Sequence, residues 1–160
     1  MGKFFGTDGV RGVANVELTP ELALRIGRAS ALVLGKEDRK PIVVGRDPRL
    51  SGQMLESAVV AGVASAGLDA VLVGVVPTPA VAFLTKALGC AGGIVISASH
   101  NPLEDNGIKV FGPDGYKLSE EVESQIEELI EADESPRPTA GAVGQVLSKP
   151  EAVELYLENL

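Results

Sequence analysis

The sequence predicts an α/β fold: a mixed, mostly parallel sheet with helices on both faces, in a single layered α/β/α domain. Short apolar runs alternate with stretches of helical periodicity along most of the chain, which is the rhythm of βαβ units. The run at residues 92–96 is apolar throughout, as expected for a strand covered on both faces. Pro and Gly residues separate these runs and mark the turns between them.

Turn and capping residues divide the first two thirds of the chain into elements. Thr19 followed by Pro20 is a helix N-cap with proline at the first helical position. Ser51 is the expected cap of a second helix, and Gly89 closes a third. The expected strands are residues 3–6, 10–13, 41–44, 71–76 and 92–96, and the expected helices span 20–33, 52–67 and 80–88.

A hairpin and an acid-rich helix are expected next. The turn residues 112–115 separate extended segments at 107–111 and 116–118. The helix that follows carries an apolar stripe through Val122 and Ile126, so we expect its acids to form a solvated face.

The last 25 residues differ in character from the rest of the chain. Residues 135–141 are rich in Pro and Gly and read as an exposed connector, and a helix with an apolar stripe starts at Pro150. Two interpretations remain open for that stripe: a longer protein continues here, or the helix packs back on this domain. We expect a domain at 1–135, followed at 136–160 by a linker and a helix that lead to an absent second domain.

Composition excludes several classes of function. The net charge of −8 is concentrated, because eight of the 22 acids lie between Glu120 and Glu134 and the remaining 14 balance 14 Lys and Arg. With no basic stripe, 4% aromatic residues and no Trp, we expect no nucleic acid binding. No apolar stretch approaches the ~18 residues of a membrane helix. One Cys and one His make neither an internal disulfide nor a usual zinc site. The chain starts without the zones of a signal peptide, so we expect a cytoplasmic protein.

The segment Ser97-Ala98-Ser99-His100-Asn101-Pro102 follows directly after the expected buried strand at 92–96. In open α/β sheets, ligands bind at the carboxyl ends of the strands, so Ser99 is a candidate nucleophile or phosphate carrier. An inert polar residue at a strand end is the equal alternative. His100 does not favour a serine hydrolase, because the Gly-x-Ser-x-Gly elbow is missing.

Three further loops carry polar side chains that suit an anion. Residues 6–12 combine three glycines with Thr7 and Arg11, although a plain turn with a surface arginine explains the pattern as well. Residues 45–51 offer two arginines at a helix start, but Arg46 and Asp47 pairing with each other is the simpler interpretation. Residues 105–109 place Lys109 in a strand beside the serine segment, as a phosphate ligand, a proton-transfer group or an ordinary edge-strand charge.

These residues resemble the first domain of the α-D-phosphohexomutase superfamily over essentially the whole chain. The resemblance rests on the serine segment 96–102, followed by Asn106-Gly107-x-Lys109, and on the opening Phe5-Gly6-Thr7-Asp8-Gly9-Val10-Arg11-Gly12. Within the superfamily the opening is most similar to the bacterial phosphoglucosamine mutases, with phosphoglucomutases and phosphomannomutases as the alternatives.

The resemblance implies one domain of a multi-domain enzyme in which Ser99 is carried as phosphoserine. Ser99 would exchange its phosphoryl group with a phosphorylated hexosamine through a bisphosphate intermediate, and a hexosamine bisphosphate would act as primer. The implied catalytic residues are Ser99, Arg11, His100 and Lys109, with Asn101, Asn106, Thr7 and Arg46 as the supporting loop residues.

The resemblance further implies one Mg²⁺ ion, which this chain would contact only through a phosphoryl oxygen on Ser99. The other metal ligands and the sugar-reading loops would lie in the remaining domains of the same enzyme, so we expect the chain alone to be inactive. No membrane partner is expected, and an oligomer is possible. A non-catalytic phosphate-binding or interaction module is the alternative from another functional class.

Overall fold

The computed structural model, which describes residues 2–160, confirms the expected fold class. A six-stranded sheet runs in the order β1-β5-β4-β2-β3-β6. The strands are β1 (Val10–Val13), β2 (Ile42–Arg46), β3 (Ala70–Val75), β4 (Gly92–Ile96), β5 (Asp105–Phe111) and β6 (Val146–Ser148). Neighbours among β4, β2, β3 and β6 pair in parallel, whereas β5 is antiparallel to both β4 and β1.

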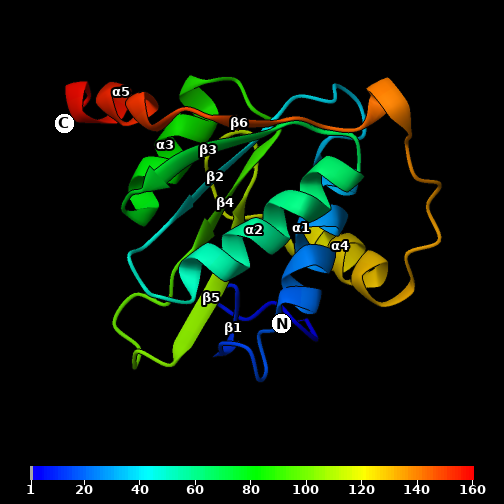
Figure 1. Ribbon diagram of the computed structural model, residues 1–160, viewed down its shortest axis with the longest axis horizontal. Helices are drawn as coiled ribbons and strands as arrows, with labels where there is room; N and C mark the ends of the chain where they lie inside the picture. Colours follow the sequence, from blue (N-terminus) through cyan, green and yellow to red (C-terminus); the bar gives the residue numbers. More distant parts are fainter. Residues whose placement is uncertain (1) are drawn as a thin grey trace.

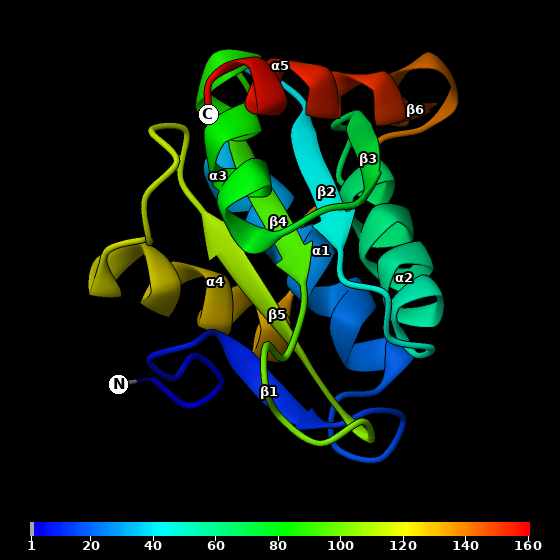
Figure 2. The ribbon, with the colours of Figure 1, turned by 90° about the vertical axis from the view of Figure 1, so that its left-hand side faces the viewer.

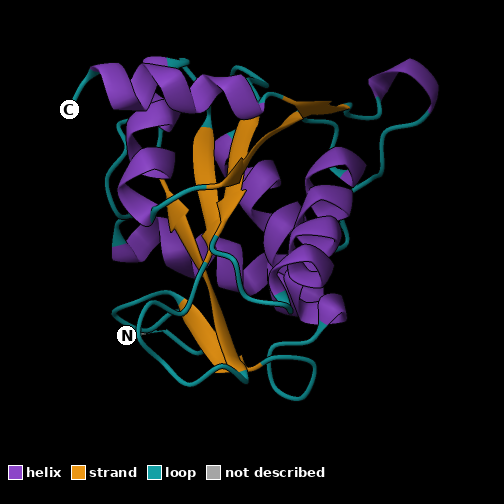
Figure 3. Cartoon of the chain, turned by 60° about the vertical axis from the view of Figure 1, so that its left-hand side comes forward, coloured by secondary structure: helices purple, strands orange, loops and turns teal. Residues whose placement is uncertain are grey.

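Helices cover both faces of this sheet (Figures 1 and 3). They are α1 (Pro20–Leu34), α2 (Gly52–Ser65), α3 (Thr78–Ala87), α4 (Glu120–Ala132) and α5 (Val153–Glu158). As the sequence predicts, Thr19 caps α1, since its Oγ1 accepts a hydrogen bond from the amide of Leu22 at 3.1 Å. Within residues 2–160, no helix combines the length and the apolar character that crossing a bilayer requires.

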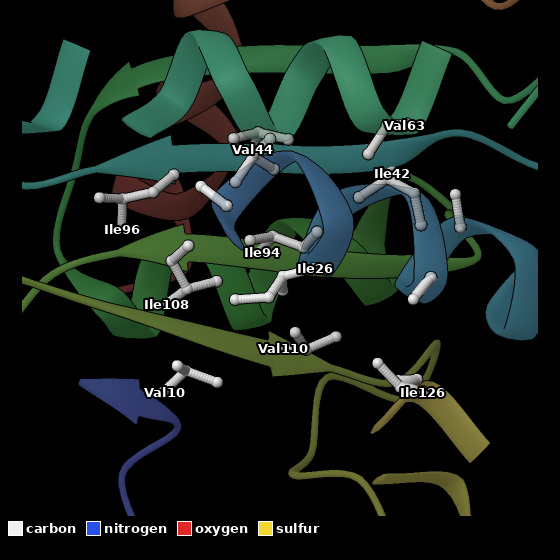
Figure 4. Packing of buried hydrophobic residues seen from close by; sticks show 14 of the residues in the cluster. Val10, Ile26, Ile42, Val44, Val63, Ile94, Ile96, Ile108, Val110 and Ile126 are labelled. Atoms are coloured by element: carbon white, nitrogen blue, oxygen red, sulfur yellow. The ribbon is translucent and has the colours of Figure 1, made fainter. Parts of the chain in front are cut away.

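Two clusters of buried side chains lie on opposite faces of the sheet. Adjacent residues of β2 show the division, because Val44 packs with the side chains of α1, α2 and α4, whereas Val43 packs with those of α3. In Figure 4, Ile26 of α1 faces Ile94 of β4 in the larger cluster. All five residues of β4 are buried, which confirms the prediction of a central strand at 92–96. The sheet therefore holds the end of β4 rigidly.

Glycines let α1 and α2 approach each other closely. A Cβ atom at Gly62 would lie 2.1 Å from the carbonyl oxygen of Leu24, and one at Gly27 would lie 2.3 Å from that of Val59. Both contacts are with backbone of the facing helix, which cannot swing aside as a side chain can. The two helices therefore require glycine at both positions.

A buried arginine ties the end of α4 to α1 and α2. Arg28 is 2% exposed and donates through Nε to the carboxylate of Asp133 and through Nη1 to the carbonyl of Ser65 at 2.9 Å. Burial opposes ionisation of Asp133, but hydrogen bonds from Ser135 and Arg28 outweigh it and hold the pKa of this carboxyl below its ordinary value of 3.8. The ionised form of Asp133 is thus favoured by folding.

Because the pKa of Asp133 is lowered by folding, its contribution to stability is complete above about pH 4 and is lost as the pH falls toward the folded-state value. We expect Asp133→Asn to lower the free energy of unfolding near neutral pH by about 3 kcal/mol, since the buried Arg28 loses its counter-charge. Urea titrations at several pH values should show this difference shrinking below about pH 4. The matched change at the exposed neighbour, Glu134→Gln, should have little effect; a pH-independent loss for Asp133→Asn would contradict the account.

Two expected strands do not form. Residues 3–6 are not a strand, because Glu127 of α4 reaches the chain there and its carboxylate accepts hydrogen bonds from the amides of Phe4 and Phe5. The turn expected at 112–115 is present, but 116–118 contribute only an isolated bridge between Phe111 and Lys117. The antiparallel partners of β5 are β4 and β1 instead.

The C-terminal segment adds a strand that the sequence analysis did not predict. β6 pairs in parallel with β3 and extends the sheet at its edge. α5 then packs on α3, with the rings of Tyr156 and Phe83 5.9 Å apart and Ala152 buried. Of the two interpretations of the terminal apolar stripe, the structure favours packing back on this domain for Tyr156, whereas Leu157 and Leu160 remain exposed.

Candidate functional site

The segment that joins β4 to β5, together with Asp105 at the start of β5, is here called the serine loop (residues 97–105). It lies where three loops meet. In Figure 2 it passes beside β1 near the bottom of the view. The carbonyl of Glu104 accepts from the amide of Ala14 just after β1, at 2.9 Å. The loop after β2 joins them, because the amide of Asp47 donates to the carbonyl of Ile96 at 2.9 Å. The carboxyl ends of β2 and β4 and the end of β1 thus form one edge.

Ser99 is exposed on this loop in an unusual backbone conformation. Its φ angle is +55°, a left-handed value that costs an ordinary residue about 1–2 kcal/mol. The Oγ of Ser97 accepts a hydrogen bond from the amide of Ser99 at 3.1 Å, which helps to hold this conformation. The backbone is therefore restrained while the Ser99 side chain faces solvent, as a group that transfers phosphate requires.

Arg11 lies beside the serine loop on β1. Its Nη1 donates to Oδ1 of Asn101 at 3.3 Å, and its Nε is buried without a hydrogen-bond partner among residues 2–160. Arg11 pairs with Gly107 of β5, and a Cβ atom at Gly107 would lie 2.9 Å from Arg11 Cγ. The missing side chain at Gly107 makes room for the arginine, which retains unused hydrogen-bonding capacity.

Lys109 lies on the same face of the sheet as Arg11. Residues 107 and 109 share one face of β5, because side chains alternate along a strand, and Arg11 is directly opposite Gly107. Diagonal neighbours of this kind are about 7–8 Å apart at the backbone, within reach of long side chains. Lys109 is half-buried and pairs with Val95 of β4, so it lies inside the sheet rather than at the start of an edge strand.

Arg49 belongs to this site, although it was not among the site residues expected from the sequence. Its Nε donates to the carboxylate of Asp47 at 3.2 Å. Its two other nitrogens donate to four carbonyls of the serine loop, at distances between 2.5 and 3.1 Å, from Ser99, Asn101, Pro102 and Asp105. The sequence signal was the pair of arginines in residues 45–51, but nothing in their spacing shows which one faces the serine loop.

Arg46 and Asp47 do not pair through their side chains, contrary to the simpler interpretation of this loop. Arg46 forms an ion pair with Glu56 of α2 at 3.5 Å, and Asp47 pairs with Arg49. Burial raises the pKa of Glu56, and the charge of Arg46 partly offsets that effect. Arg46 is therefore held against α2 by Glu56. Because the pKa of Glu56 is raised, folding disfavours the ionised form of this carboxyl.

Ser51 is the N-cap residue of α2, as expected, but its side chain does not cap the helix. Its Oγ makes no capping hydrogen bond to α2 and instead accepts from Nδ2 of Asn106 at 2.9 Å. Asn106 is fully buried, and its Oδ1 accepts from the amide of Gly107. Asn106 thus joins the start of β5 to the start of α2 from beneath the serine loop.

Two further sequence candidates are His100 and Thr7. His100 is exposed next to Ser99 at the tip of the loop. Thr7 is exposed in the tight turn between Gly6 and Gly9, and it lines a cavity of about 70 Å³ together with Lys109. The structure thus brings Thr7 and Lys109 to one cavity and Arg11 and Asn101 into contact, while Arg46 faces α2.

The side chains present do not fit a magnesium site by themselves. Within the described part of the chain, no three His, Cys, Asp or Glu residues come together as metal ligands. Two acids of this edge are engaged, since Asp47 pairs with Arg49 and Asp105 accepts a hydrogen bond from Asn101.

Comparison with known proteins agrees with this geometry. Residues 2–137 match the family model described as phosphoglucomutase/phosphomannomutase, alpha/beta/alpha domain I. The chain belongs to this family of first domains of phosphohexomutases. Its fold matches a crystal structure of a phosphoglucomutase/phosphomannomutase family protein from Burkholderia thailandensis with a TM-score of 0.83 and 29% identity, over 97% of this chain and 34% of that one.

Two curated relatives are named phosphoglucosamine mutase. The protein from Desulforamulus reducens is 57% identical over 99% of this chain, and the one from Geobacillus thermodenitrificans is 58% identical over 100% of this chain. The chain spans 36% of the length of each of these relatives.

Proposed function

We propose that this chain is the phosphoryl-carrying first domain of a phosphoglucosamine mutase, a cytoplasmic isomerase that interconverts glucosamine 6-phosphate and glucosamine 1-phosphate. Relatives with this name, 57% and 58% identical to nearly the whole chain, support the choice of sugar. A phosphoglucomutase or phosphomannomutase is the second candidate, which the broader family description favours.

One observation carries the proposal: Ser99 is exposed at a rigid sheet edge while the backbone on both sides of it is held by hydrogen bonds. A phosphoryl carrier must present its oxygen in a fixed direction, because transfer requires the attacking and leaving oxygens in line. An inert serine has no need of such restraint around a strained φ angle.

In the proposed reaction, the phosphorus–oxygen bond to Ser99 breaks as a bond to a sugar hydroxyl oxygen forms. The hydroxyl proton leaves the sugar, and the released Ser99 oxygen takes up a proton. Arg11 is suited to stabilise charge on the transferred group, because its Nε lacks a partner within residues 2–160. Lys109, on the same sheet face, is suited to hold the phosphoryl group or to transfer the proton.

His100 and Asn101 would shape the loop around the phosphoryl group, with Thr7, Arg46 and Asn106 in supporting roles. The Mg²⁺ that the superfamily resemblance implies would contact this chain only through a phosphoryl oxygen on Ser99, and the other ligands would come from the remaining domains. A hexosamine bisphosphate would supply the first phosphoryl group.

We expect the isolated 160-residue chain to be inactive as a mutase, because it spans only 36% of the length of its curated relatives. A coupled assay with Mg²⁺ and glucosamine 1,6-bisphosphate should show turnover for the complete gene product and none for the isolated chain. Turnover by the isolated chain at the rate of the complete protein would refute this expectation. Glucose and mannose phosphates, run in parallel, decide between the two sugar assignments.

The non-catalytic alternative, a phosphate-binding module, predicts a different outcome when the protein is incubated with the bisphosphate. Such a module would bind hexosamine phosphates but would never form a covalent adduct. The intact mass of the complete gene product, measured after incubation with the bisphosphate, distinguishes the two: an added phosphoryl group supports the mutase, and an unchanged mass supports the module.

A further inference from the structure

Arg49 makes four hydrogen bonds to the serine loop, yet it has no part in the reaction proposed above for Ser99. A guanidinium group has five N–H donors. Each donor of Arg49 has an acceptor: Asp47 receives one from Nε, and carbonyls of the serine loop receive two from Nη1 and two from Nη2. This side chain is only 9% exposed. Arg49 is therefore fully engaged within the protein.

Full engagement distinguishes Arg49 from Arg11. A phosphate oxygen could approach Arg49 only by displacing one of its existing partners. Among residues 2–160, the Arg11 side chain makes one hydrogen bond, to Asn101, and its buried Nε has no partner. The two arginines beside the serine loop are thus divided: Arg11 has donors to offer a ligand, and Arg49 has none.

The acceptors of Arg49 include the carbonyl of Ser99, the proposed phosphoryl carrier. Its Nη2 donates at 2.9 Å to the carbonyl of Ser99, whose φ angle is +55°, and at 2.8 Å to that of Asn101. A left-handed conformation at a non-glycine residue persists only where its surroundings hold it. Asp47 in turn orients Arg49, because it accepts from both its backbone amide at 3.1 Å and its Nε at 3.2 Å.

We propose that Arg49 is a positioning residue: oriented by Asp47, it clamps the carbonyls of the serine loop so that the Ser99 hydroxyl points in one direction for in-line transfer. Arg49 does not touch the transferred group or the sugar. This inference rests on the proposed role of Ser99 as phosphoryl carrier. It assigns the two arginines different jobs, with binding of the phosphoryl group left to Arg11.

The test is Arg49→Lys in the complete gene product. Lysine keeps the charge and the aliphatic stem but offers three donors from one point, so it cannot span four carbonyls. Misplacing a reacting group by about 1 Å costs about 100-fold in rate. We expect kcat to fall by about 100-fold while KM for the hexosamine phosphate stays within about threefold, because Arg49 makes no contact with the substrate.

Arg39→Lys is the matched control. Arg39 also donates to backbone carbonyls, those of Gly67 at 2.8 Å and Ala142 at 3.5 Å, but it lies before β2, at the opposite end of the sheet. The same chemical change there should leave kcat unaltered. A general loss of stability would lower the kcat of both variants, whereas a positioning role lowers only the kcat of Arg49→Lys.

A folded Arg49→Lys enzyme with kcat reduced by less than about tenfold, or with a raised KM at unchanged kcat, overturns the inference. If that variant does not fold, Asp47→Asn decides: faster amide hydrogen exchange in residues 97–105 together with a lower kcat supports the clamp, and unchanged values overturn it. Phosphorylation of Ser99 in the unsubstituted enzyme is measured first. If Ser99 is not phosphorylated, both the proposed function and this inference are wrong. If it is phosphorylated, the variants test the role of Arg49 alone.

Discussion

Replacing Ser99 with alanine is expected to abolish mutase activity of the complete gene product, lowering kcat by about 10⁴-fold or more, because no other group replaces a covalent carrier. The fold should be retained, since the side chain of Ser99 is exposed and packs against nothing in the core. Initial rates in the coupled assay, with a thermal melt as the check on folding, measure both effects. Activity above about 1% of the unsubstituted level in a folded protein would contradict the account.

Ser97→Ala is the matched control for this variant. It removes a hydroxyl two residues away that only accepts a hydrogen bond from the Ser99 amide. One such bond contributes about 0.5–1.5 kcal/mol, which corresponds to a rate loss of about tenfold at most. The control should therefore remain phosphorylated and active. Equal losses for the two variants would mean that the loop, rather than the Ser99 hydroxyl, is what the activity requires.

Gly62→Ala is expected to produce a large loss of stability from a small change. The added Cβ would lie 2.1 Å from the carbonyl oxygen of Leu24, so α1 and α2 must move apart along their contact. We expect a loss of about 3 kcal/mol, at the upper end for overpacking and despite the better helix propensity of alanine. For a domain of this size that corresponds to a fall in Tm of about 6–12 °C, which calorimetry measures directly.

The control for this prediction is Gly141→Ala, because a Cβ at Gly141 would meet nothing within 4 Å. Its effect should stay within about 0.5 kcal/mol. A melting temperature for Gly62→Ala that equals the control would show that the two helices are able to separate without cost, and that the close contact is not important for stability.

The elements with strong local signals were predictable from the sequence. β4 is a continuous apolar run, and α1 has a capping threonine and a proline at its start, so both were placed within a residue or two. The failures have nonlocal causes. Residues 3–6 are held by a carboxylate of α4, and the three residues of β6 pair with β3, from which α3, β4, β5 and α4 separate them in the chain. No window of sequence contains those partners.

The same distinction applies to the site. Ser99 was a candidate because it follows a buried strand, which is a local property, and the resemblance to the phosphohexomutases implied its role as carrier. The pairing of Arg46 with Glu56, and of Arg49 with the serine loop, depends on how α2 leaves β2, and two arginines three residues apart look alike in sequence. The Ser51 hydroxyl was expected to cap α2 because serine before a helix usually does so. Instead, this hydroxyl accepts a hydrogen bond from buried Asn106.

The central claim is that the hydroxyl of Ser99 carries the phosphoryl group. The most direct measurement is tandem mass spectrometry of the complete gene product, digested after incubation with glucosamine 1,6-bisphosphate and again after an excess of the monophosphate. We predict one phosphoryl group, located on Ser99 rather than on Ser97, that appears with the bisphosphate and is lost to the monophosphate. A protein that stays unphosphorylated, or that carries the group on another residue, would contradict the claim.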